Sequence, residues 1–365
     1  MINSVINNIE KYNPKTKNEY ENAFKETIQE LVLYALSKTD FFTFGAFYGG
    51  TALRIFYNLE RYSEDLDFSL LVKNDEFKIE KYFDEIEKVL SKYGLKFDIN
   101  IKNKNNETHI QSAFLKGNTL QNLITIKTPQ ELINKTQHNE IIKIKFEIDI
   151  DPPKNAEYEY KYNNFPVAHK VKIFNEASLF AGKVHAILCR SWEQRVKGRD
   201  YYDFAFYIKR KSVISLKHLQ KRIEQTNNNI FEKDLDISLL KEMLRSKFNT
   251  LSFSEIKKDI IPFIKDTEEL EIWDYDYFMY LLDNIYSNEI EFTECNSKEK
   301  HNQSKFYVGS YNEYIKKITL IKEKLHKFII KDENINSYCF INFNNQKTYF
   351  ELNEEVIKQI HAVLK

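Results

Sequence analysis

Residues 49–70, which read GGTALRIFYNLERYSEDLDFSL, constrain the fold more than any other part of the chain. A glycine pair opens a stretch with helical spacing, and a short apolar strand follows it. In that strand Asp65 and Asp67 alternate with Leu66 and Phe68. Because residues two apart in a strand point to the same side, both carboxylates project together while Leu66 and Phe68 face a core.

This pattern predicts a site for phosphate and metal. Two neighbouring carboxylates repel each other, and a divalent cation such as Mg²⁺, which prefers oxygen ligands, relieves the repulsion. The turn at Gly49 and Gly50 leads into a helix at Thr51, so backbone N–H groups and the positive end of the helix dipole can bind a phosphate. A phosphate-binding turn beside metal-binding carboxylates is what a protein needs to handle a nucleoside triphosphate.

A third carboxylate is expected from residues 141–151, IIKIKFEIDID, where apolar and charged residues alternate strictly. The alternation predicts a half-buried strand that Pro152 ends. Three carboxylates converging from two strands can hold two metal ions, which is suited to an in-line displacement. Glu147, Asp149 and Asp151 share one face of this strand, and the periodicity alone does not choose among them. We favour Asp149 because it lies near the end of the apolar run without being at its edge.

The remaining pattern predicts three units. Helical spacing occurs at 20–38, 51–60, 76–92, 176–192, 199–210 and across 216–287, and strand patterns occur at 41–50, 65–70, 95–101, 109–116 and 141–151. We therefore expect a sheet-containing core at 1–170 and a helical domain at 171–290. After a polar linker near 288–306, residues 295–365 are expected to form a small unit. Its expected elements are a helix at 310–328, strands at 337–343 and 347–352, and a helix at 353–364.

Composition excludes several classes of protein. The 365 residues are 42% hydrophobic and 30% charged, as in soluble globular proteins, and the formal net charge is zero, which argues against non-specific, charge-driven binding of nucleic acid. The three cysteines lie far apart, so we expect neither a disulfide framework nor a structural zinc site. There is no signal-peptide pattern and no run of about 20 apolar residues. We therefore expect a cytoplasmic protein without a membrane span.

Charged residues of the helical region are further candidates. Lys183 lies within or beside an apolar stripe, either as a lysine that extends from the edge of the stripe to solvent or as a cation aimed at a cleft. Asp200 and Asp203 stand at a helix start, where acids also serve as ordinary caps. The neighbouring basic residues form either a solvated face or a patch for a polyanion such as an RNA end. These residues are Arg190, Arg195, Lys197 and Arg199.

The runs AFYGGTALRIFYNLERYSEDLDFSL and SLFAGKVHAILCRSWEQRVKGRDYYDF closely resemble the AbiEii-type nucleotidyltransferase toxins of bacterial abortive-infection and toxin–antitoxin systems. The resemblance covers roughly residues 20–290. It implies an α+β fold in which a core of the DNA polymerase β-like nucleotidyltransferase superfamily, with a mixed sheet, is followed by a helical domain. The small C-terminal unit is not part of the resemblance.

The resemblance also implies roles for individual residues. The catalytic residues would be Asp65, Asp67, Lys183 and Asp203, with Asp200 as the alternative to Asp203. The nucleotide phosphates would be bound by Gly49, Gly50, Thr51 and Lys183. Together with the strand pattern, it gives Asp65, Asp67 and Asp149 as the ligands of Mg²⁺ or Mn²⁺.

Members of this family are toxins paired with a cognate antitoxin encoded by the neighbouring gene, and some transfer nucleotides to the 3′ end of tRNA. The implied function is a cytoplasmic toxin that moves a nucleotide from an NTP to an acceptor, such as the 3′ end of tRNA, releases pyrophosphate and stops growth in phage defence. Two alternatives stay open. One is nucleotide transfer to a small molecule such as an antibiotic, and the other is an interaction module that binds nucleotide without turnover.

Overall fold

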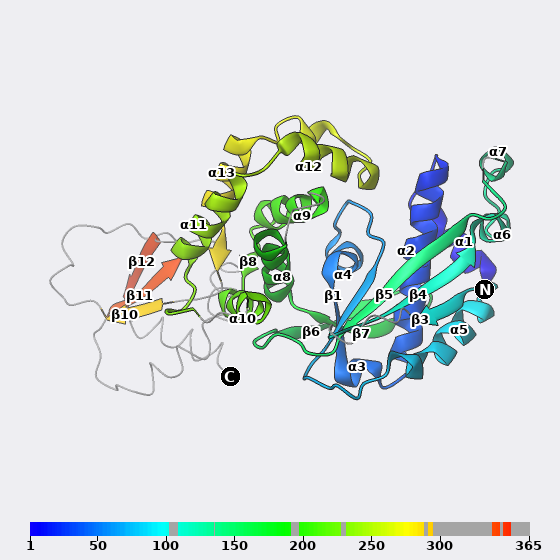
Figure 1. Cartoon of the computed structure of the whole chain (residues 1–365), viewed down its shortest axis with the longest axis horizontal. Helices are drawn as coiled ribbons and strands as arrows, with labels where there is room; N and C mark the ends of the chain where they lie inside the picture. Colours follow the sequence, from blue (N-terminus) through cyan, green and yellow to red (C-terminus); the bar gives the residue numbers. More distant parts are fainter. Residues whose placement is uncertain are drawn as a thin grey trace.

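The computed structural model describes residues 1–101, 109–134, 136–190, 197–227 and 231–287, together with the short strands 291–294, 338–343 and 346–351. A seven-stranded mixed sheet is followed by a group of helices and by a separate three-stranded sheet (Figure 1). The predicted α+β class with a mixed sheet is therefore confirmed.

The main sheet has the strand order β3–β4–β5–β2–β1–β7–β6. Its strands are β1 (Gly45–Tyr48), β2 (Leu66–Leu70), β3 (Asp98–Ile101), β4 (Ile110–Asn118), β5 (Ile141–Asp149), β6 (Tyr158–Asn163) and β7 (His169–Phe174). β2 runs parallel to β5 and β1 runs parallel to β7, whereas the other neighbouring strands are antiparallel. Because β1 and β2 are antiparallel, the end of β1 lies beside the start of β2.

The two faces of the sheet have different chemistry, as the alternation in sequence predicts. On one face the rings of Phe47, Phe68 and Phe146 form a buried row with centroids 5.0 Å apart from strand to strand. Helix α2 (Lys17–Ser37) contacts β5 and β7 on this side and begins with a capping box at Thr16. The polar side chains of β2 and β5 therefore lie on the other face.

Helices of the first half largely follow the predicted ranges. α2 covers 20–38, α4 (Gly49–Tyr57) covers most of 51–60, and the turn η1 (Ile79–Tyr82) with α5 (Phe83–Lys92) covers 76–92. Four short helices were not predicted, namely α1 (Ile2–Glu10), α3 (Phe41–Phe44), α6 (Thr119–Thr125) and α7 (Gln130–Ile133). α3 occupies the start of 41–50, so only the second half of that range is a strand.

Strands β6 and β7 were missed by the sequence analysis. β7 crosses the predicted core boundary at residue 170, so the sheet continues to Phe174. β6 forms the edge of the sheet, and its alternating Tyr160 and Tyr162 are exposed, so its aromatic residues do not mark a buried face.

Helices dominate the following region, as predicted. They are α8 (Glu176–Cys189), α9 (Gly198–Lys209), α10 (Leu216–Asn227), α11 (Ile237–Phe248), α12 (Phe253–Ile260) and α13 (Tyr275–Asp283), with the short turns η2 (Ile261–Phe263) and η3 (Glu268–Leu270) and the paired strands β8 (Val213–Ile214) and β9 (Tyr286–Ser287). α9 and α12 pack closely because a Cβ on Gly198 would overlap the carbonyl oxygen of Ile256. Among the helices described, none is long and apolar enough to cross a membrane.

The C-terminal strands β10 (Glu291–Glu294), β11 (Tyr338–Phe343) and β12 (Gln346–Glu351) form an antiparallel sheet. The strands predicted at 337–343 and 347–352 are thus confirmed, while the helices predicted at 310–328 and 353–364 lie outside the described residues. The linker predicted at 288–306 is wrong in part, because β10 lies within it and pairs with β11.

Candidate active site

The turn between β1 and α4 needs its glycines because neighbouring side chains occupy the space of a Cβ. Gly49 has φ +80°, and a Cβ there would overlap the carboxylate of Asp67. A Cβ on Gly50 would lie 2.6 Å from Nη2 of Arg61 and 3.0 Å from Oγ of Ser63. The turn therefore contacts two parts of the site: Asp67, the predicted metal ligand, at Gly49, and the loop before β2 at Gly50.

Thr51 follows the glycines, but its side chain has an internal role. The buried hydroxyl hydrogen-bonds with Ser63 Oγ at 2.9 Å and with the carbonyl oxygen of Asp65. The first N–H groups of a helix have no partner within the helix. A contribution of Thr51 to phosphate binding, as expected from the resemblance, is thus limited to its backbone N–H, while its hydroxyl holds the loop before Asp65.

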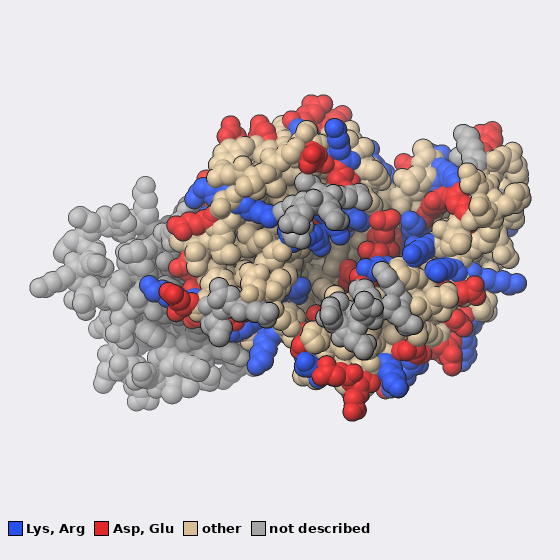
Figure 2. Space-filling view, in the orientation of Figure 1, with Lys and Arg blue, Asp and Glu red and all other residues tan. Residues whose placement is uncertain are grey.

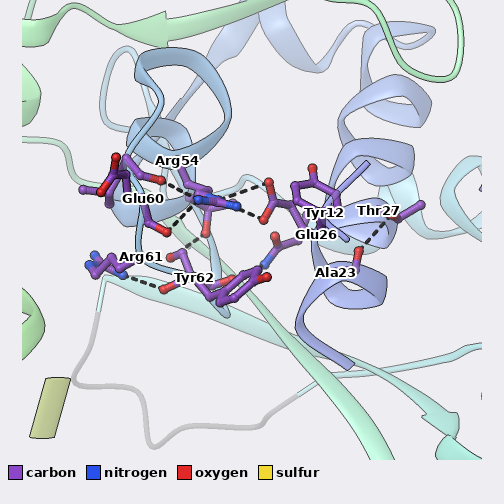
Figure 3. A network of polar contacts seen from close by, with 12 residues as sticks. Tyr12, Ala23, Glu26, Thr27, Arg54, Glu60, Arg61 and Tyr62 are labelled. Carbon is purple, nitrogen blue, oxygen red and sulfur yellow. Dashed lines mark hydrogen bonds and ion pairs between the residues drawn. The ribbon is translucent and has the colours of Figure 1, made fainter. Parts of the chain in front are cut away.

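Arg54 fixes the remainder of that loop (Figure 3). Its Nε donates to the carboxylate of Glu26 on α2 at 3.0 and 3.2 Å. Its Nη1 donates to the carbonyl oxygens of Leu59 and Glu60 at 2.7 and 2.8 Å, and the guanidinium lies 5.0 Å from the ring centroid of Tyr62. The connection between the glycine turn and the acid-bearing strand is therefore rigidly attached to α2.

Three polar side chains lie in a row across the open face of the sheet. The register pairs Tyr48 of β1 with Asp67 of β2, and Asp67 with Glu147 of β5. Burial raises the pKa of Asp67 to about 7, and the charges of Asp65 and Glu147 add to this increase. Negative charges from two strands thus converge beside the glycine turn.

The position of Asp149 does not favour it as the third carboxylate. The same register places Asp149 level with Ser69, and its side chain accepts a hydrogen bond from the backbone N–H of Asp151 at 3.0 Å. Glu147, level with Asp67, lines the cavity described below. Periodicity along β5 could not distinguish these residues, because the choice depends on the register with β2.

The three-carboxylate cluster predicted from the sequence is not preassembled. In the described parts of the chain, no three His, Cys, Asp or Glu side chains are grouped as a metal site. Glu147 is engaged elsewhere, since it accepts a hydrogen bond from Ser112 at 2.7 Å and is paired with Lys145. The donor set nevertheless fits Mg²⁺ or Mn²⁺, because the register places the carboxylate-bearing residues Asp67 and Glu147 side by side on neighbouring strands, and a divalent cation favours oxygen ligands.

Lys183 of α8 faces this site from the helical part. Its Nζ lies 2.8 Å from Asp200 Oδ1 and 2.8 Å from Asp203 Oδ2. Burial acts to lower the pKa of Lys183, but the two carboxylates outweigh it and raise the pKa above its ordinary value. The lysine is therefore positively charged and lines the cavity. This position agrees with the second of the two alternatives predicted from the sequence, a cation aimed at a cleft.

Asp203 lies behind the lysine and holds it in place. It is fully buried and forms a two-point ion pair with Arg61, with N–O distances of 2.6 and 2.6 Å. Burial acts to raise its pKa, but Arg61 and Lys183 hold the pKa below the usual value. Asp200 lines the cavity and Asp203 does not, so Asp203 has no access to a substrate there. Its geometry is that of a positioning residue and not of the catalytic acid expected from the resemblance.

A cleft of about 390 Å³ separates the two groups of residues. The sheet part lines it with Tyr48, Gly49, Gly50, Leu53, Asp67 and Glu147, and the helical part lines it with residues of α8, α9 and α10 that include Lys183, His185, Arg190, Asp200 and Arg222. Figure 2 shows Lys and Arg side chains together with Asp and Glu side chains around the hollow near the middle of this face. The volume is in the range of small-ligand sites.

The basic residues predicted to form one patch have different surroundings in the structure. Arg190 lines the cavity and is paired with Asp200. Arg199 donates to Glu64 at 3.2 Å and stacks on Phe263, and Arg195 lies outside the described residues. Arg222 was missed by the sequence analysis, because a single arginine in a polar helix carries no pattern that would distinguish it from a surface residue.

A mixed sheet that carries acids beside a glycine turn, with a cationic helix across a nucleotide-sized cleft, is the arrangement of a nucleotidyltransferase. The chain belongs to the AbiEii family, whose model, described as nucleotidyl transferase AbiEii toxin of type IV toxin–antitoxin systems, matches residues 31–289. The resemblance found in the sequence is thereby confirmed, and the protein is an enzyme of the nucleotidyltransferase class and a toxin of this family.

Solved structures give more distant matches. A Helicobacter pylori protein assigned as a nucleotidyltransferase is 19% identical, with 71% of this chain and 89% of the other covered and a TM-score of 0.38. JHP933 from Helicobacter pylori is 18% identical, with 72% and 88% covered and a TM-score of 0.38. MenT4, a nucleotidyltransferase toxin from Mycobacterium tuberculosis H37Rv, is 14% identical, with 77% and 99% covered and a TM-score of 0.40. No curated protein matches the sequence.

Proposed function

We propose that this toxin acts in the cytoplasm, where it transfers a nucleotide from an NTP to the 3′ end of tRNA and stops growth during phage defence. An antitoxin encoded by the neighbouring gene is its expected regulator. The observation that carries the proposal is the contact between Asp67 and the glycine turn, across one cleft from Lys183. This arrangement supports binding of a triphosphate next to carboxylates.

The residues divide the work of the transfer between positioning and neutralisation of charge, which dominate phosphoryl chemistry. The backbone N–H groups of the turn at Gly49 and Gly50 bind phosphate oxygens, and Lys183 neutralises their charge. Asp65, Asp67 and Glu147 are the residues that would hold Mg²⁺ or Mn²⁺. When bound, the metal supplies positive charge at the reacting phosphate.

The acceptor hydroxyl attacks the α-phosphorus, the bond to the bridging oxygen of the β-phosphate breaks, and pyrophosphate leaves. Arg190 and Arg199, with Arg195, are proposed to bind the phosphate backbone of the acceptor. Asp203 is proposed to act through Lys183, since it touches the lysine and is buried away from the cleft.

The test is transfer of label from α-³²P-labelled NTPs to total tRNA. Asp67→Asn, which keeps the shape of the side chain and removes its charge, is expected to lower labelling at least 100-fold, as for the loss of a strong electrostatic contact to the reacting group. Asp75→Asn is the matched control, because Asp75 is exposed beyond the other end of β2, and it should label like the wild type. Equal labelling by Asp67→Asn and the wild type would refute the chemistry.

The same variants separate a toxin from the alternatives. Expression of the wild type is expected to stop growth, and expression of Asp67→Asn is not, while the neighbouring gene should restore growth. Antibiotic protection without growth arrest would instead support transfer to a small molecule. NTP binding without any labelled acceptor would support a binding module.

A further inference from the structure

Arg222 of α10 is a cation of the cleft that the proposed mechanism leaves without a role. It lines the cavity with residues of both parts of the molecule. Its Nε is buried and has no hydrogen-bond partner in the described part of the chain. A buried donor without a partner is costly in the free protein, and a bound acceptor removes that cost. The unpaired Nε of Arg222 therefore indicates a ligand with oxygen acceptors.

The other two strong cations of the cavity are already neutralised. Lys183 and Arg190 both pair with Asp200, and Lys183 pairs with Asp203 as well. Arg222 forms no ion pair with any described acid. The pKa of Asp149, which burial raises, responds to the charge of Arg222 but the two side chains do not form a salt bridge. Among the described residues that line the cavity, Arg222 is thus the Lys or Arg side chain that has no acidic partner.

The position of Arg222 relates it to the phosphate site. The guanidinium lies against α8 at Gly182, where Cζ and Nη1 are each 3.9 Å from the place of a Cβ on that glycine. Gly182 directly precedes Lys183. Burial raises the pKa of the Tyr48 hydroxyl, and the positive charge of Arg222 opposes this increase, which places Arg222 within electrostatic reach of the residue before Gly49. Arg222 therefore shares the cavity with Lys183 and the glycine turn.

We propose that Arg222 binds the terminal phosphates of the nucleoside triphosphate and retains the pyrophosphate that leaves, a role that rests on the proposed function. A guanidinium binds phosphate oxygens through two parallel hydrogen bonds, and the β- and γ-phosphates carry most of the charge of an NTP. The phosphates of an RNA backbone have the same chemistry. The buried Nε and the nearness of the glycine turn favour the smaller and more charged ligand.

The experiment measures binding of inorganic pyrophosphate by isothermal titration calorimetry in the presence of MgCl₂, so that neither the base nor the acceptor has to be known. Arg222→Met is expected to weaken pyrophosphate binding at least tenfold, and Arg222→Lys should recover part of it. Lys221→Met is the matched control, because this neighbouring lysine pairs with Glu224 at an exposed position and should bind as the wild type does. GMP, which lacks the terminal phosphates, should bind equally to the wild type and Arg222→Met, whereas GTP should not.

Several outcomes would overturn the inference. The first is equal pyrophosphate affinity of the wild type and Arg222→Met, and the second is no pyrophosphate binding by the wild type. The third is a variant that loses only tRNA binding in filter-binding assays, which would assign Arg222 to the acceptor. Circular dichroism and thermal melting establish that each variant is folded. If pyrophosphate binding depends on Arg222 but no RNA is labelled, the subsite stands and the proposed acceptor fails. If RNA is labelled and Arg222→Met binds pyrophosphate normally, the subsite fails and the proposed function stands.

Discussion

A buried histidine next to the cleft links the charge of individual residues to stability. His218 of α10 is fully buried, and its Nδ1 donates to the carbonyl oxygen of Lys154 at 2.9 Å. Burial lowers the pKa of His218 from 6.5 to about 4, and the nearby charge of Arg222 contributes to the decrease. The residue is thus neutral in the folded protein, while the unfolded chain takes up a proton below pH 6.5.

His218 is therefore expected to make stability fall in acid. Because its pKa is depressed by folding, its contribution is complete above pH 6.5 and is lost as the pH falls towards 4. Between pH 7 and pH 5 the loss in the free energy of unfolding should be about 2 kcal/mol. Urea denaturation of the wild type and His218→Gln at both pH values measures it. The prediction fails if both proteins lose the same stability between the two pH values.

At the scale of residues, the sequence predicted the candidate site residues that can be recognised from the pattern of their own segment. Alternation and helical spacing predicted Asp65, Asp67 and Lys183 as candidates, and the structure places Asp67 and Lys183 in the lining of the cleft. Glu147, the internal role of Thr51 and the burial of Asp203 depend on partners in other elements, and no pattern in a single segment determines them. Arg222 was not predicted, because its place in the cleft also depends on other elements.

At the scale of elements, the glycine turn between β1 and α4 is the part that local sequence specified best. The turn and the strand that follows the helix were both predicted from the order of residue types, and the structure adds that Gly49 has φ +80°. The missed strands are β6, at the edge of the sheet, and β7 beside it. They have only six residues each, whereas β5 has nine, and β7 is placed in the sheet by its pairing with β1 and β6.

The turn itself can be tested by adding one methyl group. Gly49→Ala would force a side chain into the left-handed region at φ +80° and into the carboxylate of Asp67, so we expect a loss of stability of about 1 kcal/mol or more and at least a tenfold loss of nucleotide transfer. Gly94→Ala is the control, because Gly94 has φ +79° but its Cβ would meet only Ile2, at 3.7 Å. Thermal melts should shift for both variants, and labelling should fall only for Gly49→Ala. Full labelling by Gly49→Ala would contradict the proposed site.

At the scale of the whole molecule, the sheet and the helices are joined by a buried ion pair. Arg61, in the loop before β2, binds Asp203 of α9 with both partners at most 3% exposed. A more accessible, half-buried pair joins the same two elements nearby, since Arg199 of α9 donates to Glu64. The sequence could not predict the buried pair, because its members are 142 positions apart and each belongs to a segment with its own local explanation.

Removal of one partner should therefore affect the two pairs very differently. Arg61→Met leaves Asp203 buried with Lys183 as its remaining cation and is expected to cost about 3–5 kcal/mol of unfolding free energy. Arg199→Met, which removes the more accessible pair, should cost about 1 kcal/mol or less. Urea denaturation of both variants against the wild type provides the comparison. Similar costs for the two substitutions would show that the buried pair does not hold the two parts together.

The carboxylate of Asp200 has a consequence for selectivity, because it occupies the two cations that an incoming anion would use. The carboxylate competes with any anionic ligand for Lys183 and Arg190. A ligand therefore binds there more readily the more its negative charge exceeds that of Asp200. A triphosphate carries more negative charge than a monophosphate and so gains more from such an exchange. We therefore expect the enzyme to bind nucleoside triphosphates in preference to monophosphates.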